Sequence, residues 1–160
     1  QVDRAVRQAA AITLKNTVRR KWCPNPEVVD APCTFLPDHK TSFRMNIMEA
    51  LLRETDNSVR DILAETVRIV ASYDFPDDWP AIVPTIVAQL QTGEVLRVHN
   101  SMLALRKLVK RFEYKPKDGR GPLLAVMRVT LPLLLAMSHQ LTSDDSMEAG
   151  QVTCLLVVCC

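Results

Sequence analysis

The chain has 160 residues, of which 48% are hydrophobic and 24% charged, and its formal net charge at pH 7 is +2. These values are typical of a folded globular unit and exclude a disordered or fibrous chain. The near balance of 20 basic and 18 acidic residues also argues against a surface built mainly to neutralise nucleic-acid phosphates.

The sequence has no recognisable targeting signal, and its cysteines are typical of a protein of the cytosol or the nucleus. No uninterrupted apolar run approaches the roughly 18 residues that cross a bilayer, and a signal-peptide layout is missing, so we expect a soluble chain and no membrane partner. The chain starts without methionine and ends within the apolar run CLLVVCC, so we expect a fragment of a longer protein. Its cysteines form an odd set without repeated spacing, which indicates reduced thiols: Cys23, Cys33, Cys154, Cys159 and Cys160.

The first predicted element is an amphipathic helix over residues 6–22, VRQAAAITLKNTVRRKW. Apolar and small side chains recur at steps of three and four residues, which places them on one side of this helix: Val6, Ala9, Ala10, Thr13, Leu14, Thr17 and Val18. The other side is polar and mostly basic: Arg7, Lys15, Asn16, Arg19 and Arg20. Residues 23–42 contain four prolines and no periodicity, so we expect a long insertion loop there.

Two more helices are predicted after this loop. The stretch 43–52 has helical periodicity, and a polar turn follows in which Ser58 is the expected N-cap. The next helix has apolar residues at helical steps from Val59 to Tyr73 and is expected to end at the turn 74–76.

The second half of the chain is also expected to be helical. Helices are predicted over 80–91 and 95–112, separated by Thr92 and Gly93. An apolar helix over 123–141 contains Pro132, which removes a backbone donor and is expected to kink it. A last helix is expected to begin near Met147.

An internal repeat organises these helices. Three long helices end in an aromatic residue followed closely by proline, at Trp22, Tyr73 and Phe112. Tyr73 and Phe112 are 39 residues apart, close to the roughly 40 to 47 residues of a HEAT or armadillo unit. Trp22 and Tyr73 are 51 apart, and the excess matches the proline-rich insertion. The sequence therefore predicts an all-α protein, an α-α superhelix (an α-solenoid of HEAT/armadillo-like repeats) rather than a closed bundle.

Four stretches, taken in this order, resemble a known family: VRQAAAITLKNTVRRKW, FRMNIMEALL, DFPDDWPAIVPTIVAQL and LVKRFEYKPKDGRGPL. The most specific elements are the triplet at residues 14–16, the DFP and WP pair within 74–80, and FEYK at 112–115. Over roughly residues 4–141 the chain resembles the amino-terminal HEAT repeats of importin-beta superfamily nuclear transport receptors (karyopherins), with the importin-seven and importin-eight group as the most similar branch.

The resemblance implies two-helix repeats whose second helix lines a concave face, and first repeats that bind the small GTPase Ran in its GTP state. On that register residues 1–22 are the inner helix of a truncated repeat, residues 23–42 an insertion loop, and residues 43–73, 80–112 and 122–160 further repeats, the last one truncated. The Ran-facing surface would then carry these side chains: Lys15, Asn16, Arg19, Arg20, Asp61, Glu65 and Arg68. An ordinary solvated face is the alternative for this charged set.

The family also implies protein cargo, Phe-Gly nucleoporins bound between outer helices, and shuttling between cytoplasm and nucleus through pores of the nuclear envelope. Phe75, Trp79 and Tyr114 lie at turns between helices, where the favoured role is to cover the ends of stacked repeats rather than to bind a partner.

A second basic face is expected on the outer side of helix 95–112: Arg106, Lys107, Lys110 and Arg111. Clustered positive charge neutralises phosphates. Interleaved aromatic residues are missing apart from Phe112, which the helical pattern buries, so nucleic acid is an unlikely partner. An acidic cargo or a partner's acidic loop is at least as well supported.

No catalytic residue, cofactor or metal is expected. The sequence has no glycine-rich phosphate loop and no Gly-x-Ser-x-Gly motif, and Cys23, Cys33 and His39 have spacings unlike a zinc site. The leading hypothesis is a transport receptor fragment that binds Ran-GTP and contributes to nuclear import of protein cargo. The alternative is a general HEAT-repeat protein-protein interaction scaffold without Ran dependence.

Overall fold

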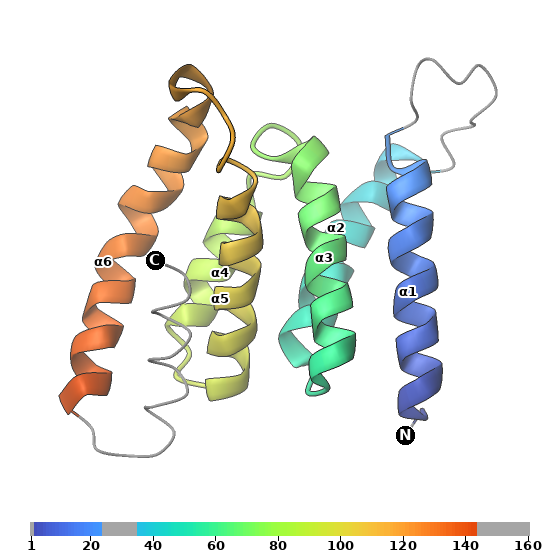
Figure 1. Ribbon diagram of the computed structural model, residues 1–160, viewed down its shortest axis with the longest axis horizontal. Helices are drawn as coiled ribbons and strands as arrows, with labels where there is room; N and C mark the ends of the chain where they lie inside the picture. Colours follow the sequence, from blue (N-terminus) through green and yellow to red (C-terminus); the bar gives the residue numbers. More distant parts are fainter. Residues whose placement is uncertain (1, 24–34, 144–160) are drawn as a thin grey trace. The chain divides into compact units, whose positions relative to one another are not determined.

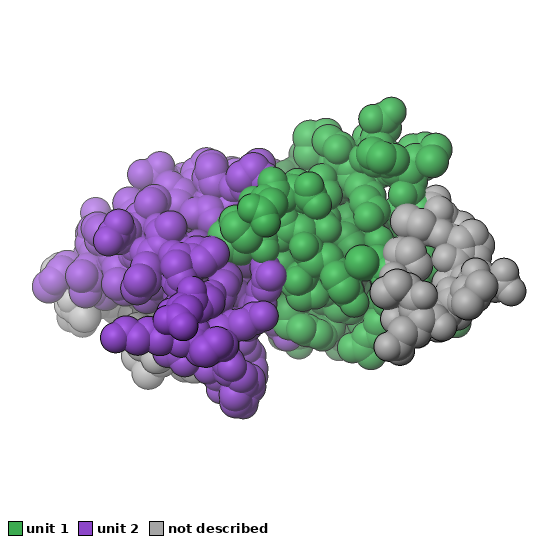
Figure 2. Space-filling view, turned by 90° about the horizontal axis from the view of Figure 1, so that it is seen from above, with its two compact units in different colours: residues 1–79 green, residues 80–160 purple. Residues whose placement is uncertain are grey.

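A computed structural model describes residues 2–23 and 35–143 of the chain. These residues form six α-helices, one short 3-10 helix and no strand, which confirms the all-α prediction (Figure 1). In chain order they are α1 Arg4–Lys21, α2 Pro37–Arg53, α3 Asn57–Asp74, α4 Ile82–Leu90, α5 Val95–Lys110, η1 Lys117–Arg120 and α6 Gly121–Ser143. The chain divides into two compact units, unit 1 with residues 1–79 and unit 2 with residues 80–160 (Figure 2). The helix expected from Met147 lies outside the described residues, as do all cysteines except Cys23.

The start of α2 differs from the sequence prediction. Residues 23–42 were expected to form a loop because of their prolines, but α2 begins at Pro37. A proline at the first helical position is favourable, since its fixed φ suits a helix and its missing N–H would have no partner there. Asp38 lies in the first turn, where a negative charge is stabilised by the helix dipole. The last proline of the segment therefore begins a helix instead of extending a loop.

The start of α3 also differs from the prediction, since its N-cap lies two residues earlier in the chain than expected. Asp56, not Ser58, is its N-cap, because the Asp56 carboxylate accepts a hydrogen bond of 3.1 Å from the backbone N–H of Val59. This hydrogen bond is the largest cause of a lowered pKa for Asp56. At the other end the carbonyl of Asp74 accepts from the N–H groups of Asp78 and Trp79, which closes the following turn. A side chain thus caps the start of α3, and backbone hydrogen bonds close the turn after its end.

In unit 1 both α1 and α2 pack against α3, which makes α3 the most buried of the three helices. The core that they share consists mainly of aliphatic side chains with one tryptophan: Val18, Trp22, Ile47, Leu51, Leu52, Leu63, Val67 and Val70. Since α2 and α3 are consecutive and joined by a short turn, they form the antiparallel helix pair expected of a HEAT-type repeat. The assignment of residues 43–73 to one repeat stays a prediction.

The buried side of α1 was predicted wrongly. Ala11, Val18 and Trp22 face the core, whereas Val6 is 58% exposed and Ala9, Ala10 and Thr13 are exposed too. Alanine and threonine contribute little apolar area, so their periodicity is a weak guide to the buried side. Trp22 contributes far more area and determines which side of α1 faces α3. Tyr73 was likewise expected on the apolar side of its helix, but it is 51% exposed.

In unit 2, α4 packs against both α5 and α6, and η1 contacts α6. The turn between α4 and α5 contains Gly93 with a φ of +74°, a conformation that favours glycine. The core is apolar and includes most residues that periodicity had placed inside: Ile82, Ile86, Leu90, Val98, Met102, Leu105, Leu108 and Phe112. The helix α6 continues through Pro132, so this proline does not end it.

Candidate partner-binding surface

The residues predicted to face Ran lie on two helices that are in contact. Lys15, Asn16, Arg19 and Arg20 belong to α1, and the other three belong to α3. The two helices run parallel, since Arg4 at the start of α1 bonds to Asp56 at the start of α3 and Trp22 at the end bonds to Asp74. The two predicted sets of residues therefore lie on neighbouring helices of unit 1.

On α3 the three charged residues share one narrow strip. Asp61, Glu65 and Arg68 are spaced by four and three residues, so they follow one line along a helix. Asp61 is exposed and the other two are half-buried, on a helix whose remaining sides are largely buried. Arg68 donates to the same Glu65 oxygen from Nε at 3.0 Å and from Nη2 at 2.7 Å. This hydrogen bond raises the pKa of Arg68 and holds its side chain along the helix.

On α1 the four residues do not share one side. Lys15 and Arg19 are four residues apart and lie on one face, and Asn16 and Arg20 lie on another. Arg20 follows buried Val18 by two residues, which is a rotation of about 200° around the helix. Arg20 and Asn16 therefore point away from the core side of α1, and both are exposed. The basic residue nearest the core side is half-buried Lys15.

A buried polar cluster that the sequence analysis missed joins the helices at the end of unit 1 where α1 and α3 both terminate. Trp22 Nε1 donates to both carboxylate oxygens of Asp74 at 3.0 Å, and Arg44 Nε donates to Asp74 Oδ2 at 2.8 Å. Trp22 is fully buried and Asp74 is 4% exposed. We call Trp22, Arg44 and Asp74 the Asp74 cluster. It joins α1, α2 and α3 through one carboxylate.

Aromatic rings surround the Asp74 cluster. The ring of Trp22 lies 5.2 Å from the rings of both Phe35 and Phe43, measured between centroids. Lys40 Nζ lies 5.2 Å from the Trp22 ring, within the range of a cation–π contact. The signal in the sequence was a carboxylate at the end of an apolar helix together with an indole N–H, which needs an acceptor when it is buried. Their pairing across 52 positions is visible only in three dimensions.

Two ion pairs hold the opposite end of unit 1. Arg4 Nε lies 2.6 Å from Asp56 Oδ2, and Arg7 Nη1 donates to both oxygens of Glu54 at 2.7 and 2.8 Å. These contacts fix the start of α1 on the turn between α2 and α3. Arg7, which the sequence placed on the outer basic side, is thus half-buried and paired.

A hollow of about 660 Å³ lies beside the Asp74 cluster. Its lining includes Lys40, Arg44 and Asp78, so it presents both signs of charge. Arg44 in this lining is already paired with Asp74.

The four residues of the predicted second basic face lie in the last turns of α5 and at its C-cap. Arg106 and Lys110 are exposed, and Lys107 and Arg111 are half-buried, with the Arg111 guanidinium 5.5 Å from the Phe112 ring. Basic residues in the last helical turn are stabilised by the negative end of the helix dipole.

The three turn aromatics have different environments. Phe75 and Trp79 are 6% and 5% exposed, in agreement with a structural role. Tyr114 is 89% exposed, so the structural role expected for it is wrong.

Two further findings concern classes of site that were not expected. Among the described residues, no three His, Cys, Asp or Glu side chains are grouped so that they could hold a metal ion. One helical stretch, Lys117–Gln140, is long and apolar enough to cross a membrane by length and composition, and an 18-residue window within it has a mean hydropathy of 1.6 and 11% of its residues buried. The stretch contains Arg128 and Pro132. A single stretch of this kind is weak support for a membrane span, because core helices meet the same criterion.

Comparisons with known proteins agree with this arrangement. Residues 1–53 match the family described as Importin-beta N-terminal domain. The chain is 39% identical over 148 residues to mouse Importin-8, an alignment that covers 91% of this chain and 15% of that protein. It is 26% identical over 155 residues to Drosophila melanogaster Exportin-2, covering 94% of this chain and 16% of that protein. An Importin beta-like SAD2 homolog of Arabidopsis thaliana is 24% identical over 157 residues, covering 98% and 15%.

The chain thus spans about one seventh of the length of these curated relatives. Their similarity runs over nearly the whole chain and includes both units. Together with the matched amino-terminal domain and the all-α arrangement of paired helices, this similarity shows that the chain belongs to the importin-beta family.

Proposed function

We propose that the chain is part of a nuclear transport receptor that binds Ran in its GTP state and contributes to the import of protein cargo. The observation that carries the proposal is the match of residues 1–53 to the importin-beta N-terminal domain, together with identity of 39% to an importin. Relatives named exportins match at lower identity, and for this reason we propose import.

The charged residues of α1 and α3 support a protein partner with its own charged surface. Lys15 and Arg19 on α1 and Asp61, Glu65 and Arg68 on α3 offer both signs of charge on neighbouring helices. Charge of this kind speeds the encounter with a complementary surface and selects against wrong partners. The Asp74 cluster and the ion pairs at the other end hold α1 on α3, so little order has to be gained on binding.

Cargo release then requires two shapes of the receptor with different affinity for Ran-GTP. In a helical-repeat protein each repeat contacts only its neighbours, so small rotations accumulate along the array. Ran-GTP shifts the population toward the shape that it binds better. We propose further that Phe-Gly nucleoporins bind between outer helices and that the protein shuttles between cytoplasm and nucleus through the pores. A fluorescent fusion followed in living cells tests this distribution.

Calorimetric titration with Ran tests the proposed partner directly. The chain is titrated with Ran loaded with a GTP analogue or with GDP. Binding to the GTP form alone is the expected result. Equal binding to both forms, or no binding, contradicts the proposal and favours a general HEAT-repeat scaffold without Ran dependence.

A pair of neighbouring variants separates the two faces of α1. Arg19→Glu reverses a charge on the Lys15 side, and Arg20→Glu makes the same change on the side opposite to Val18. We expect Arg19→Glu to weaken binding of the GTP form by about tenfold, since it replaces attraction by repulsion, and Arg20→Glu to change it less than about twofold. A larger effect of Arg20→Glu would assign the contact to the other face.

A further inference from the structure

The segment of unit 2 from residue 95 to residue 128 carries an excess of positive charge. Between residues 95 and 128 the sequence has nine basic and two acidic side chains. Arg97 is paired with Glu94, at 3.2 Å between Nε and Oε2. The remaining basic residues outnumber the carboxylates of this segment, Glu113 and Asp118, several times. Such a segment attracts negatively charged partners over the Debye length.

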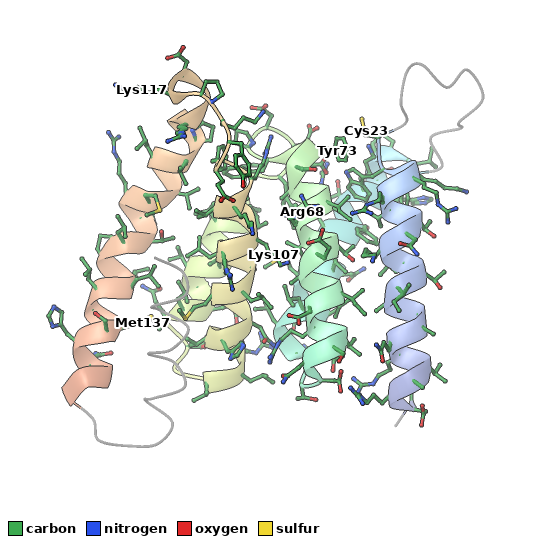
Figure 3. All side chains as sticks on the ribbon, viewed as in Figure 1. Cys23, Arg68, Tyr73, Lys107, Lys117 and Met137 are labelled. Atoms are coloured by element: carbon green, nitrogen blue, oxygen red, sulfur yellow. The ribbon has the colours of Figure 1, made fainter. Side chains whose placement is uncertain are left out.

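Four of these basic residues form what we call the α5-end surface: Arg106, Lys110, Lys115 and Lys117. All four are exposed. Arg106 and Lys110 are four residues apart on α5 and therefore lie on one face. Figure 3 labels Lys117, which lies in η1 just before α6. The surface extends the predicted second basic face beyond the end of α5.

Hydrogen bonds give the turn that carries this surface a defined backbone. The N–H of Glu113 donates to the carbonyl of Lys110 at 3.3 Å, and the N–H of Lys115 donates to that of Phe112 at 3.1 Å. Arg120 Nε donates to the Lys115 carbonyl at 2.8 Å, which folds the chain after α5 back on itself. The backbone that presents the lysines is therefore ordered before any partner arrives, so binding costs less conformational entropy.

We propose that the α5-end surface binds an acidic segment of a partner protein. The charges on it are separated rather than continuous, because Glu113 and Asp118 interrupt the basic residues. Lysine ammonium groups act as single point charges with three donors, which suits separate carboxylates. The proposal concerns unit 2 alone and does not depend on Ran binding.

A nucleic acid fits this surface less well than an acidic protein segment. Proteins that bind single strands combine a basic groove with several aromatic side chains on which successive bases stack. Between residues 95 and 128 the structure exposes one such ring, Tyr114, because Phe112 is buried. A single-stranded nucleic acid would therefore gain only charge attraction and one stacking contact from this surface.

Fluorescence anisotropy with labelled peptides tests the proposal. The probe is a twelve-residue peptide of alternating glutamate and serine, and the same peptide with glutamine replaces it as the uncharged control. Lys110→Glu, Lys115→Glu and Lys117→Glu are combined in one variant of the chain. Its matched control combines Lys21→Glu, Arg53→Glu and Arg128→Glu, three exposed basic residues outside the α5-end surface and outside the proposed Ran-facing set, so that both variants have the same net charge.

At about 50 mM salt we expect the first variant to lose at least about tenfold in affinity for the glutamate peptide and the control variant to lose less than about twofold. A third variant, with glutamine in place of the three lysines, should lose an intermediate amount of affinity for the glutamate peptide. Far-UV circular dichroism reports whether charge reversal disturbs folding, and if it does, the glutamine variant replaces the charge-reversed one in the test. Equal losses in the first variant and its control would overturn the proposal, as would failure of the unchanged chain to prefer the glutamate peptide. Tighter binding of a single-stranded oligothymidylate than of the peptide would overturn it in favour of nucleic acid.

Discussion

Unit 1 and unit 2 use their charged residues in different ways. In unit 1 three ion pairs join different helices or the turn between them: Arg4 with Asp56, Arg7 with Glu54 and Arg44 with Asp74. The described part of unit 2 has nine basic and only three acidic residues, so most of its positive charge faces solvent. The difference indicates that charge in unit 1 holds helices together, whereas charge in unit 2 is available to a partner.

Exposed large apolar side chains occur in both units, but in unit 2 they gather on one helix. In unit 2 the helix α6 exposes four large apolar side chains, Leu124, Val129, Leu131 and Leu135. Separately, an apolar groove of about 380 Å³ is lined by residues of α4, α5 and α6 that include Leu90, Val98 and Met137, the last labelled in Figure 3. In a helical-repeat protein such a face is normally covered by a stacked neighbour. An apolar face of this kind favours association when it lacks a cover.

The largest effect is expected from breaking the Asp74 cluster. Asp74→Ala leaves the Trp22 N–H and the Arg44 guanidinium buried without their acceptor, and removal of one partner of a buried ion pair costs about 3–5 kcal/mol. Both tryptophans lie in unit 1, so their fluorescence in urea reports the unfolding of this unit. Asp77→Ala, at an exposed neighbouring position, is the matched control. Similar urea midpoints for the two variants would show that the cluster does not stabilise unit 1.

A smaller loss is expected when only the indole donor is removed. Trp22→Phe keeps an aromatic ring beside Phe35 and Phe43 and leaves the pair of Asp74 with Arg44 in place. We expect a loss of about 2 kcal/mol from the missing hydrogen bond to a charged acceptor and the smaller ring. Trp79→Phe makes the same change at another buried tryptophan, and each variant keeps one tryptophan as a probe. If Trp79→Phe destabilises unit 1 as much as Trp22→Phe does, the hydrogen bond from Trp22 to Asp74 has no specific effect on stability.

The N-cap of α3 predicts a pH dependence of unit 1. Hydrogen bonding to Val59 lowers the pKa of Asp56 below its ordinary value of 3.8, so the folded state binds this proton more weakly than the unfolded state. The stabilisation is therefore complete above that value and is lost as the pH falls through the lower folded pKa. Asp56→Asn keeps a good N-cap without the charge. The difference in urea midpoint between the two chains should be constant at pH 5 to 7 and shrink below about pH 4; a difference that stays constant to pH 2.5 would contradict it.

The smallest effect on stability is expected on the open face of unit 2. Leu131→Gln combined with Leu135→Gln changes side chains that are 41% and 59% exposed, so the free energy of unfolding should change by less than about 0.5 kcal/mol. Self-association, measured by sedimentation over a range of concentrations, should decrease because the apolar face is reduced. Ala125→Gln changes an exposed small residue of the same helix and is the control. Unchanged sedimentation in the double variant would show that this face does not drive association.

Sequence reasoning identified the helices well wherever large apolar residues recur at helical steps. The end of α3, the break at Gly93 and the burial of Phe112 were all predicted. It failed at the start of α2, because proline both prevents helices and begins them. It also failed for the orientation of α1, whose alanines and threonines carry too little apolar area to define a side.

The sequence predicted which residues of two helices belong to the candidate surface, but it did not predict which of their side chains share a face. Asp61, Glu65 and Arg68 share a strip because helical spacing alone requires it. The separation of Arg19 from Arg20 depends on which side of α1 is buried, and contact with α3 decides that side. The exposure of Tyr114 depended on the course of its turn, which local patterns do not define.

The sequence by itself determined the all-α class, the paired helices and the family, because these properties follow from periodicity and from motifs that are local in the chain. Only the tertiary structure decided how Trp22, Arg44 and Asp74 meet and which basic residues remain exposed. Contacts between residues some 50 positions apart arise from the burial of one tryptophan against a neighbouring helix, and no local pattern contains that pairing.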